Sequence, residues 1–332
     1  LRHLKIDAVD ILLYHPELQS LTYLCSAGFR SPSPTRPLMR VGEGLAGQVV
    51  MKGRIEHIPD LQKAIEIARD PLLIREGFVS YIGVPLIVKG QIKGLFEIFH
   101  RSPFSPNDEW MQFMQTLSGQ AAIAIENSQL FDNLQHSNQE IRQAYDTTLE
   151  GWARALELRD SETEGHTRRV TKLTMQLARY MNTNDDDMVN IYRGVLLHDI
   201  GKMGVPDQIL RKTSSFTDLE WAEMRKHPQH AFDLLSPIPY LRPALDIPYC
   251  HHEHWDGSGY PRGLKGEQIP LAARIFSVVD IWDALLSDRP YRDAWSEDEA
   301  IAHLKDISGK ILDPKVVEAF LKMISEEDSE TG

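Results

Sequence analysis

The sequence predicts an α+β chain of two domains, in which an antiparallel sheet with helices precedes a long connecting helix and an all-α C-terminal domain. The length of 332 residues suits two domains of ordinary size, each able to bury a core. Runs with strand character are confined to the first 100 residues, whereas helical periodicity dominates from about residue 106 to about residue 324. This change of pattern places the domain boundary in or beside the long helix.

Four short apolar runs in the first 100 residues predict strands that pair as two hairpins. Gly90 in the turn between the last two runs is typical of a tight hairpin connection. A proline-rich segment, residues 31–37, predicts a loop, and a glycine-rich segment, residues 42–47, leads into a helix that ends near Lys52. The predicted strands are residues 6–14, 21–24, 81–88 and 92–100.

A helix of unusual length is predicted to connect the two domains. Ser105 suits the N-cap and Pro106 the first helical position, and no proline follows until after Arg159. Apolar residues recur at helical spacing, so residues 106–152 form one helix, or two nearly continuous ones, overlapping both domains. Because long amphipathic helices seldom stay solvated alone, we expect this helix to pair two chains. An acidic tail, residues 326–332, is expected to be disordered.

The composition is that of an ordinary globular protein and limits the classes of partner. The formal net charge of −12 argues against a nucleic-acid polymer as ligand, although metal ions or local cations could still attract a small anion. No apolar run approaches the roughly 18 residues that a membrane span needs, and the first residues lack the apolar stretch of a signal peptide. Cys25 and Cys250 are too isolated for a zinc or redox motif. We therefore expect a cytoplasmic location and two reduced thiols.

The first half of the chain resembles a GAF domain over about residues 1–130. The resemblance rests on the glycine-rich segment with its following helix, on Val84-Pro85-Leu86, on Gly94-Leu95-Phe96-Glu97 and on the helical segment 121–130. It implies a sensory domain that regulates the second half, or a domain that mainly dimerises. The ligand that such a domain would sense is left open.

Histidines and carboxylates of the second half form an ordered set that suits metal binding. Glu162 and His166 are four apart, which places both on one face of a helix. His198-Asp199 ends one apolar run and Asp280 interrupts another; burying such groups is costly unless they are paired or bound to a metal. The full set is Glu162, His166, His198, Asp199, His227, His251, His252 and Asp280.

The donor types and their number predict more than one transition-metal ion. A mixed nitrogen and oxygen set without thiolates suits iron, manganese or zinc. Eight candidates are too many for one ion, fit two ions that share a bridging carboxylate, and leave room for a third. Two metal ions a few ångströms apart are a standard means of displacement at phosphorus, with a hydroxide between them as the attacking group.

The second half resembles the HD-GYP type of the HD metal phosphohydrolases over about residues 148–325. His198-Asp199 is the HD signature, and residues 251–261, HHEHWDGSGYP, match the HHE-x-x-DG-x-GYP motif at every fixed position. The resemblance implies hydrolysis of cyclic di-GMP to linear pGpG, with GMP as a further product left open. It also implies that Asp199 bridges two ions, that Glu162 and His166 help hold a third, and that iron is favoured, with manganese next.

Several further residues have predicted roles that each compete with a plainer interpretation. Lys202 would bind substrate and stabilise developing charge or protonate the leaving oxygen, rather than being a solvated lysine at a helix end. Arg289 and Arg292 would bind the second phosphate, unless they only belong to a surface loop. Tyr260 would stack on guanine or present its loop to a signalling partner, and Gly257, Gly259 and Pro261 would shape that loop. Asp256 and Asp283 would orient ligand histidines or cap loops.

One departure from the family pattern concerns the approach to the site. After Leu210-Arg211-Lys212 the family usually has a Pro-Gly turn, whereas this chain has Thr213-Ser214-Ser215-Phe216. The metal ligands are untouched, but the conformation of the loop, and with it access to the site, is left open.

Three functions remain open on the sequence alone. The first is an active cyclic di-GMP phosphodiesterase regulated by the GAF domain. The second is a catalytically weak receptor for a cyclic dinucleotide, or a module that docks a partner. The third is a hydrolase of another cyclic dinucleotide, such as cyclic GMP-AMP, or of a nucleoside triphosphate, which the GYP motif disfavours. The absence of any lost ligand favours an enzyme.

Overall fold

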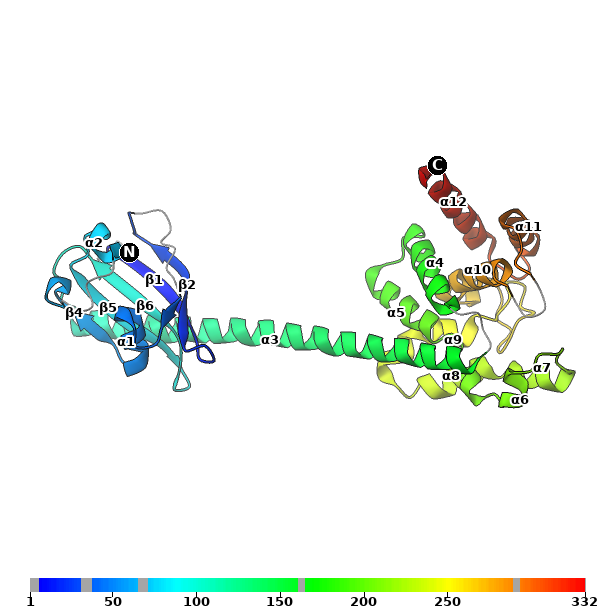
Figure 1. Cartoon of the computed structure of the whole chain (residues 1–332), viewed down its shortest axis with the longest axis horizontal. Coiled ribbons are helices and arrows are strands. Elements are labelled where there is room, and N and C mark those ends of the chain that lie inside the picture. Colours follow the sequence, from blue (N-terminus) through cyan, green and yellow to red (C-terminus); the bar gives the residue numbers. More distant parts are fainter. Residues whose placement is uncertain (1–5, 31–37, 65–70, 161–164, 289–292, 332) are drawn as a thin grey trace. The chain divides into compact units, whose positions relative to one another are not determined.

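The computed structural model describes residues 6–30, 38–64, 71–160, 165–288 and 293–331. The chain divides into two compact units, Leu1–Gln139 and Glu140–Gly332. The first unit is an antiparallel sheet with helices, the second is helical, and a long helix runs from one into the other (Figure 1). The predicted fold class is therefore confirmed. No helix among the described residues combines the length and apolar character needed to cross a bilayer.

The first unit contains a six-stranded sheet in which every neighbouring pair of strands is antiparallel. Its strands are β1 (Ala8–His15), β2 (Ser20–Ala27), β3 (Met39–Arg40), β4 (Glu56–Ile58), β5 (Ser80–Val88) and β6 (Gln91–His100), in the order β3-β2-β1-β6-β5-β4. Lys89 and Gly90 join β5 to β6 with φ angles of 51° and 78°. Two successive positive φ values are what a two-residue hairpin turn requires, so the predicted turn is present, with Gln91 already in β6.

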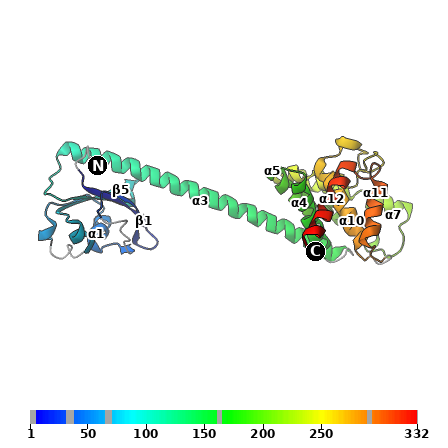
Figure 2. The same cartoon turned by 90° about the horizontal axis from the view of Figure 1, so that it is seen from above.

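The two faces of the sheet are covered by different helices. Alternate residues of a strand point to opposite faces, and Tyr81 and Ile82 in β5 accordingly belong to separate apolar clusters. Tyr81 shares its cluster with helix α1 (Gly44–Lys52) and with Leu73 of α2 (Pro71–Glu76). Ile82 shares the other with Met114 and neighbouring residues of helix α3 (Asp108–Arg159). Figure 2 shows α1 and α3 on opposite sides of the sheet.

Helix α3 is a single continuous helix of 52 residues, but it begins later than the sequence predicts. Asn107, not Ser105, supplies the side chain that accepts the backbone N–H of Trp110, 2.9 Å away. Asparagine is as good an N-cap as serine, so the helix starts where a side-chain oxygen reaches its first turn. The predicted proline-rich loop, residues 31–37, lies outside the described residues.

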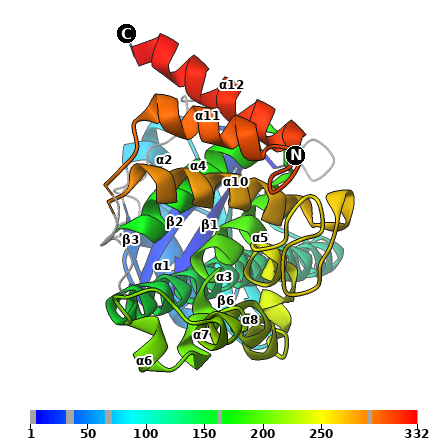
Figure 3. The same cartoon turned by 90° about the vertical axis from the view of Figure 1, so that its right-hand side faces the viewer.

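The second unit is built from helices that pack around the central helix α10. Helix α10 packs against α4, α9, α11 and α12, and Figure 3 shows it running beside α4 beneath α11 and α12. Its buried face carries Ile275, Phe276, Val278 and Val279, as expected for a helix in the middle of a domain. Besides the end of α3, the helices described in this unit are α4 (His166–Tyr180), α5 (Asp185–Leu196), the 3-10 helix η3 (Ile200–Gly204), α6 (Asp207–Leu210), α7 (Asp218–Met224), α8 (His227–Leu235), η4 (Pro239–Ala244), α9 (Asp246–Cys250), η5 (Gly266–Gln268), α10 (Leu271–Leu286), α11 (Glu297–Ile307) and α12 (Pro314–Thr331).

The acidic tail is helical, which corrects the prediction of disorder. Helix α12 continues to Thr331 instead of ending near residue 324. When an existing helix is extended, each residue that becomes ordered gains one backbone hydrogen bond. Glutamate is also a good helix former. Net charge alone therefore does not end this helix.

Candidate metal centre

Most of the predicted metal ligands that the structure describes lie at or next to the ends of helices in the second unit. His166 is the first residue of α4, His227 is the first of α8, and Asp280 lies within α10. His198 and Asp199 lie in the turn after α5, and His251 and His252 follow α9. The segment around His227 forms two helices: α7 ends at Met224, and Pro228, which lacks an N–H group, is accommodated in the first turn of α8.

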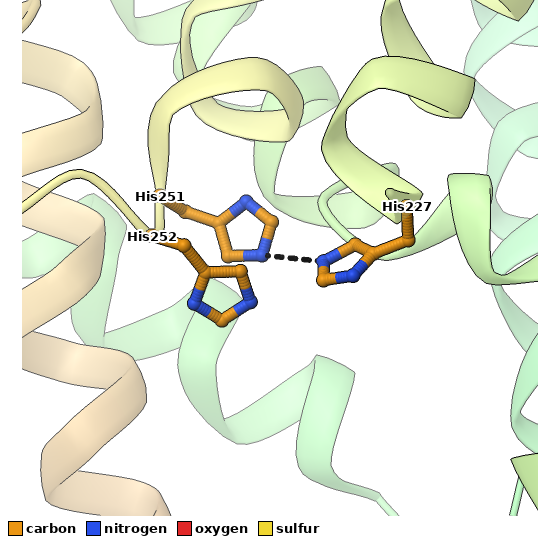
Figure 4. A group of neighbouring side chains, drawn as sticks. All are labelled: His227, His251 and His252. Carbon is orange, nitrogen blue, oxygen red and sulfur yellow. Dashed lines mark hydrogen bonds between the residues drawn. The ribbon is translucent and has the colours of Figure 1, made fainter. Parts of the chain in front are cut away.

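Six of these side chains form two groups of converging ligand atoms. His227, His251 and His252 make one group (Figure 4), and His166, His198 and Asp280 make the other. Within each group all the ligand atoms lie within 4.8 Å of one another. The eighth predicted ligand, Glu162, lies outside the described residues.

Asp199 contacts both groups through different oxygens. Its Oδ1 lies 3.4 Å from Nε2 of His227 and 3.8 Å from Nε2 of His251. Its Oδ2 lies 3.0 Å from Nε2 of His198, a member of the other group. A carboxylate placed in this way can ligate two cations at once, which is the bridging role that the sequence resemblance implies.

Backbone carbonyls determine which nitrogen of each ring faces the centre. Nδ1 of His198, His227 and His251 lies 2.8, 2.8 and 3.0 Å from the carbonyl oxygens of Val195, Met224 and Ile247. A carbonyl can only accept, so each Nδ1 carries the hydrogen and each Nε2 keeps its lone pair. Outer hydrogen bonds of this kind are typical of histidines that bind metal through Nε2.

The contact drawn in Figure 4 is the observation that calls for a cation. Nε2 of His227 lies 3.3 Å from Nε2 of His251. Since both Nδ1 atoms already donate to carbonyls, the Nε2 atoms of two neutral rings would point their lone pairs at each other and repel. A metal ion, which accepts both lone pairs, removes this repulsion. The donor set therefore fits a cluster of transition-metal ions.

Burial keeps these histidines neutral, as ligands must be. Removal from water lowers the pKa of His227, lowers that of His251 well below its usual range, and lowers that of His252 to about 3. Burial also opposes ionisation of Asp199, but the positive charge of Lys202 is the main influence that outweighs it and holds the pKa of this carboxyl well below its usual range. At neutral pH these three imidazoles are therefore neutral and Asp199 is ionised.

Lys202 lies at the edge of the centre between two acids. Its ammonium is 2.7 Å from Oδ2 of Asp199 and 2.8 Å from Oδ2 of Asp160. Its side chain is largely buried, so it is not a solvated lysine at a helix end. Asp160, directly after α3, was not predicted; no motif surrounds it, and its proximity to Lys202 arises only in the folded chain.

Asp283, one turn after Asp280 in α10, orients His166, a predicted metal ligand. Its Oδ2 accepts from Nδ1 of His166 at 2.7 Å, and its Oδ1 accepts from Nε of Arg169 at 2.6 Å. Although burial acts to raise its pKa, these hydrogen bonds lower it to about 2. Of its two predicted roles, the structure shows the orienting one. Asp256 instead accepts the N–H of Ser258, so it caps a loop.

Close packing of backbones sets the distance between η3 and α8, two helical segments of the centre. A Cβ added to Gly201 in η3 would lie 1.8 Å from the carbonyl oxygen of His227. Only glycine therefore allows η3, which follows Asp199, to meet the start of α8. The packing of these two backbones places the Asp199 carboxylate beside the His227 ring.

The loop after His252 holds Tyr260 against the centre. Glu253, itself buried, accepts the backbone N–H groups of Arg262 and Leu264, each at 2.8 Å. The N–H of Tyr260 bonds to the carbonyl of His252 at 3.1 Å, and the two rings stack with centroids 4.8 Å apart. Gly259 permits this fold, because a Cβ there would lie 2.5 Å from the same carbonyl oxygen.

A pocket with a cavity volume of about 520 Å³ opens over the centre. Proposed ligands from both groups line it, together with Lys202 and Tyr260. This volume is within the usual range of about 300–1,000 Å³ for small-molecule sites. Arg289 and Arg292, predicted to bind the second phosphate, lie outside the described residues.

Comparison with protein families agrees with this architecture. The family model of the HD domain matches residues 151–316, which is half of the chain. The chain belongs to the HD-domain family. A GAF domain matches residues 2–125, so this HD-domain protein also has the N-terminal domain that the sequence resemblance implies.

The HD-domain protein has several curated relatives with named activities. A response regulator of Xanthomonas campestris pv. campestris named as a cyclic di-GMP phosphodiesterase is 38% identical over 61% of this chain and 53% of its own length. A cyclic di-GMP phosphodiesterase of Thermotoga maritima is 43% identical over 51% of this chain and 47% of its own length. A 3'3'-cGAMP-specific phosphodiesterase of Vibrio cholerae is 34% identical over 60% of this chain and 37% of its own length. The chain therefore spans about half, or less, of the length of these relatives.

Proposed function

We propose that this protein is a metal-dependent phosphodiesterase that hydrolyses a cyclic dinucleotide. The observation that carries the proposal is the contact of Asp199 with both groups of ligand atoms at the wall of a pocket. Bound metal ions would neutralise charge on the phosphate and lower the pKa of water at the site. His166, His198, Asp199, His227, His251, His252 and Asp280 would hold them, with Glu162 as a further ligand of a third ion.

The protein's own side chains would orient the reacting groups and move a proton. Asp283 keeps His166 turned with Nε2 toward the centre, and the carbonyls behind His198 and His227 do the same for those rings. Lys202 Nζ lies on the same side of Asp199 as His198, where it can bind a phosphate oxygen and protonate the leaving oxygen. We propose iron as the metal and manganese as the alternative. The nitrogen and oxygen donors suit both, as they suit zinc, and the preference for iron comes from the sequence resemblance.

Cyclic di-GMP is the substrate that we propose, with linear pGpG as product. Relatives named as cyclic di-GMP phosphodiesterases support it at 38% and 43% identity. The second candidate is cyclic GMP-AMP, because a relative named as specific for it is 34% identical. Both share the two phosphodiester bonds that the centre would attack and differ only in one base.

The test is turnover by protein purified without oxygen, with its metal content measured on the same sample. We expect cyclic di-GMP to be converted to pGpG, cyclic GMP-AMP to be converted more slowly, and a chelator to abolish both reactions. Product chromatography measures each rate. Protein that carries its metals and hydrolyses neither compound would contradict the proposal.

We further propose that the protein is a homodimer paired through α3 and regulated by its GAF domain. Phe131, Leu134, Ile141 and Trp152 of α3 are 42–65% exposed. They are separated by 3, 7 and 11 residues, so all four fall on the a and d positions of one heptad stripe. Such a stripe is the pattern of a two-stranded coiled coil. Docking of a signalling partner on the loop that carries Tyr260 stays a prediction.

Light scattering tests the dimer directly. We expect a mass of twice 37.9 kDa for the chain, and a monomer when Leu134 and Ile141 are both changed to glutamate. A like change at exposed Leu158, outside the stripe, is the control and should leave the dimer intact. A monomeric unmodified chain would exclude pairing through α3.

A further inference from the structure

A row of aromatic rings and cationic groups extends outward from the candidate metal centre along the pocket. Tyr260, stacked on His252, has the guanidinium of Arg225 5.5 Å from its ring centroid. The same guanidinium lies 5.9 Å from the ring of Trp221. Trp221 in turn meets the ring of Phe216 at 89°, with centroids 5.2 Å apart.

We propose that Trp221, braced by Phe216, is a nucleobase-binding residue of the pocket. The inference rests on the proposed function, because it concerns how a base of the bound cyclic dinucleotide is held, whereas the metal centre would bind a phosphate. One base would stack on the indole while a phosphate lies at the metal centre. Base stacking on an aromatic side chain contributes to affinity and tolerates any base, because every base has a π face.

Among the described residues, Trp221 belongs to none of the buried apolar clusters of the protein. Helix α7 contains no buried residue, and Trp221 is 46% exposed. The helix is held by other groups: Thr217 and Glu220 form a capping box, and Lys212 lies 2.6 Å from Glu220. A large aromatic side chain that lines a pocket without joining the core is better placed for a ligand than for stability.

The segment before α7, Thr213-Ser214-Ser215-Phe216, supplies the brace. Thr213 and Phe216 both line the pocket. An edge-to-face contact such as that of Phe216 restricts the orientation of the indole, so less freedom is lost when a base binds.

A stacking residue leaves a different kinetic signature from a residue at the reacting atoms. The base does not change during hydrolysis, so its contact with Trp221 is equally strong in the ground state and the transition state. Removing such uniform binding raises KM and leaves kcat unchanged. The contact also ignores base identity, so both cyclic dinucleotides should be affected alike.

The experiment compares the unmodified protein with Trp221→Ala, Trp221→Phe and Leu219→Ala, all metal-loaded. Leu219 is on the same helix, is 84% exposed and does not line the pocket, so it is the matched control. For Trp221→Ala we expect KM for cyclic di-GMP to rise roughly 5- to 100-fold with kcat within about twofold. Trp221→Phe should restore much of the affinity, and Leu219→Ala should match the unmodified protein.

Two binding measurements complement the kinetics. The dissociation constant of a non-hydrolysable phosphorothioate analogue of cyclic di-GMP should rise by the same factor as KM in Trp221→Ala. Inhibition by inorganic phosphate, which has no base, should be unchanged, because phosphate would occupy only the metal centre. A thermal melt shows that each variant is folded.

The outcomes separate this inference from the proposed function. An unchanged KM and dissociation constant in Trp221→Ala, with the unmodified protein active, overturns the stacking role and leaves the phosphodiesterase intact. A fall in kcat alone also overturns it, since Trp221 would then act through the geometry of the centre. An unmodified, metal-loaded protein that neither binds nor hydrolyses a cyclic dinucleotide overturns the proposed function and this inference together.

Discussion

Changing Asp199 to asparagine is expected to remove most of the bound metal and to lower kcat/KM for cyclic di-GMP by more than about 1000-fold. Loss of one preorganised charge-stabilising group already costs roughly 100- to 1000-fold. Asp199 contacts His198 through one oxygen and His227 through the other, so its loss affects both groups of ligand atoms. The change keeps the side-chain volume but replaces one carboxylate oxygen with a poor ligand. Metal analysis and steady-state kinetics on the same preparation measure the effect.

A matched control separates loss of a metal ligand from loss of a buried charge. Asp313 is also a buried aspartate of the second unit, paired with Arg274 at 2.6 Å, and it does not line the pocket over the centre. Asp313→Asn is expected to lower thermal stability while the folded fraction keeps its metal and its turnover. Equal metal content in Asp199→Asn and in the unmodified protein would show that Asp199 does not bridge two metal ions.

Replacing Lys202 with alanine is expected to preserve the metal and to lower kcat about 100- to 1000-fold. Lys202 cannot be a metal ligand while it is protonated, and its ammonium is 2.7 Å from Oδ2 of Asp199. Its removal takes away the positive charge that would stabilise the phosphate oxygens and the proton that would be transferred to the leaving oxygen. Because this interaction strengthens in the transition state, kcat should fall much more than KM changes. The measurement is steady-state kinetics alongside metal content.

Lys226→Ala is the control for the lysine. Lys226 is more than half exposed, pairs with Glu223 and does not line the pocket. It carries the same charge in the same unit, so a general loss of positive potential would affect both variants. We expect Lys226→Ala to keep its full rate. If Lys202→Ala keeps its rate as well, the lysine has no part in proton transfer or charge stabilisation.

Elements with long, regular patterns were predictable from the sequence, and elements that depend on a neighbour were not. The hairpin of β5 and β6 follows from two apolar runs joined by a glycine turn, and helix α3 follows from helical periodicity over residues 106–152. Strand β3 has only two residues, Met39 and Arg40, and is a strand because it pairs with β2. Strand β4 and helix α2 are similarly short, so packing rather than local propensity fixes them.

The residues of the candidate site divide in the same way. The histidines and acids that occur in motifs were identified by type and order, and the structure brings the described ones together. Asp160 had no local signal, because its contact with Lys202 spans 42 residues of sequence. The role of Asp283 as an orienting group was one of two open possibilities, and only the folded position of His166, 117 residues away, decides it. Phe216 was noticed as a departure, but its place in the pocket was not predictable.

The most direct test of the centre is anomalous diffraction from crystals of protein purified without oxygen. Data collected at the absorption edges of iron and manganese locate each ion and identify it. We predict one anomalous peak beside His227, His251 and His252, a second beside His166, His198 and Asp280, and Asp199 within about 2.2 Å of both. Crystals of active protein with no peak at these side chains, or with a single peak that Asp199 does not touch, would contradict a metal cluster bridged by Asp199.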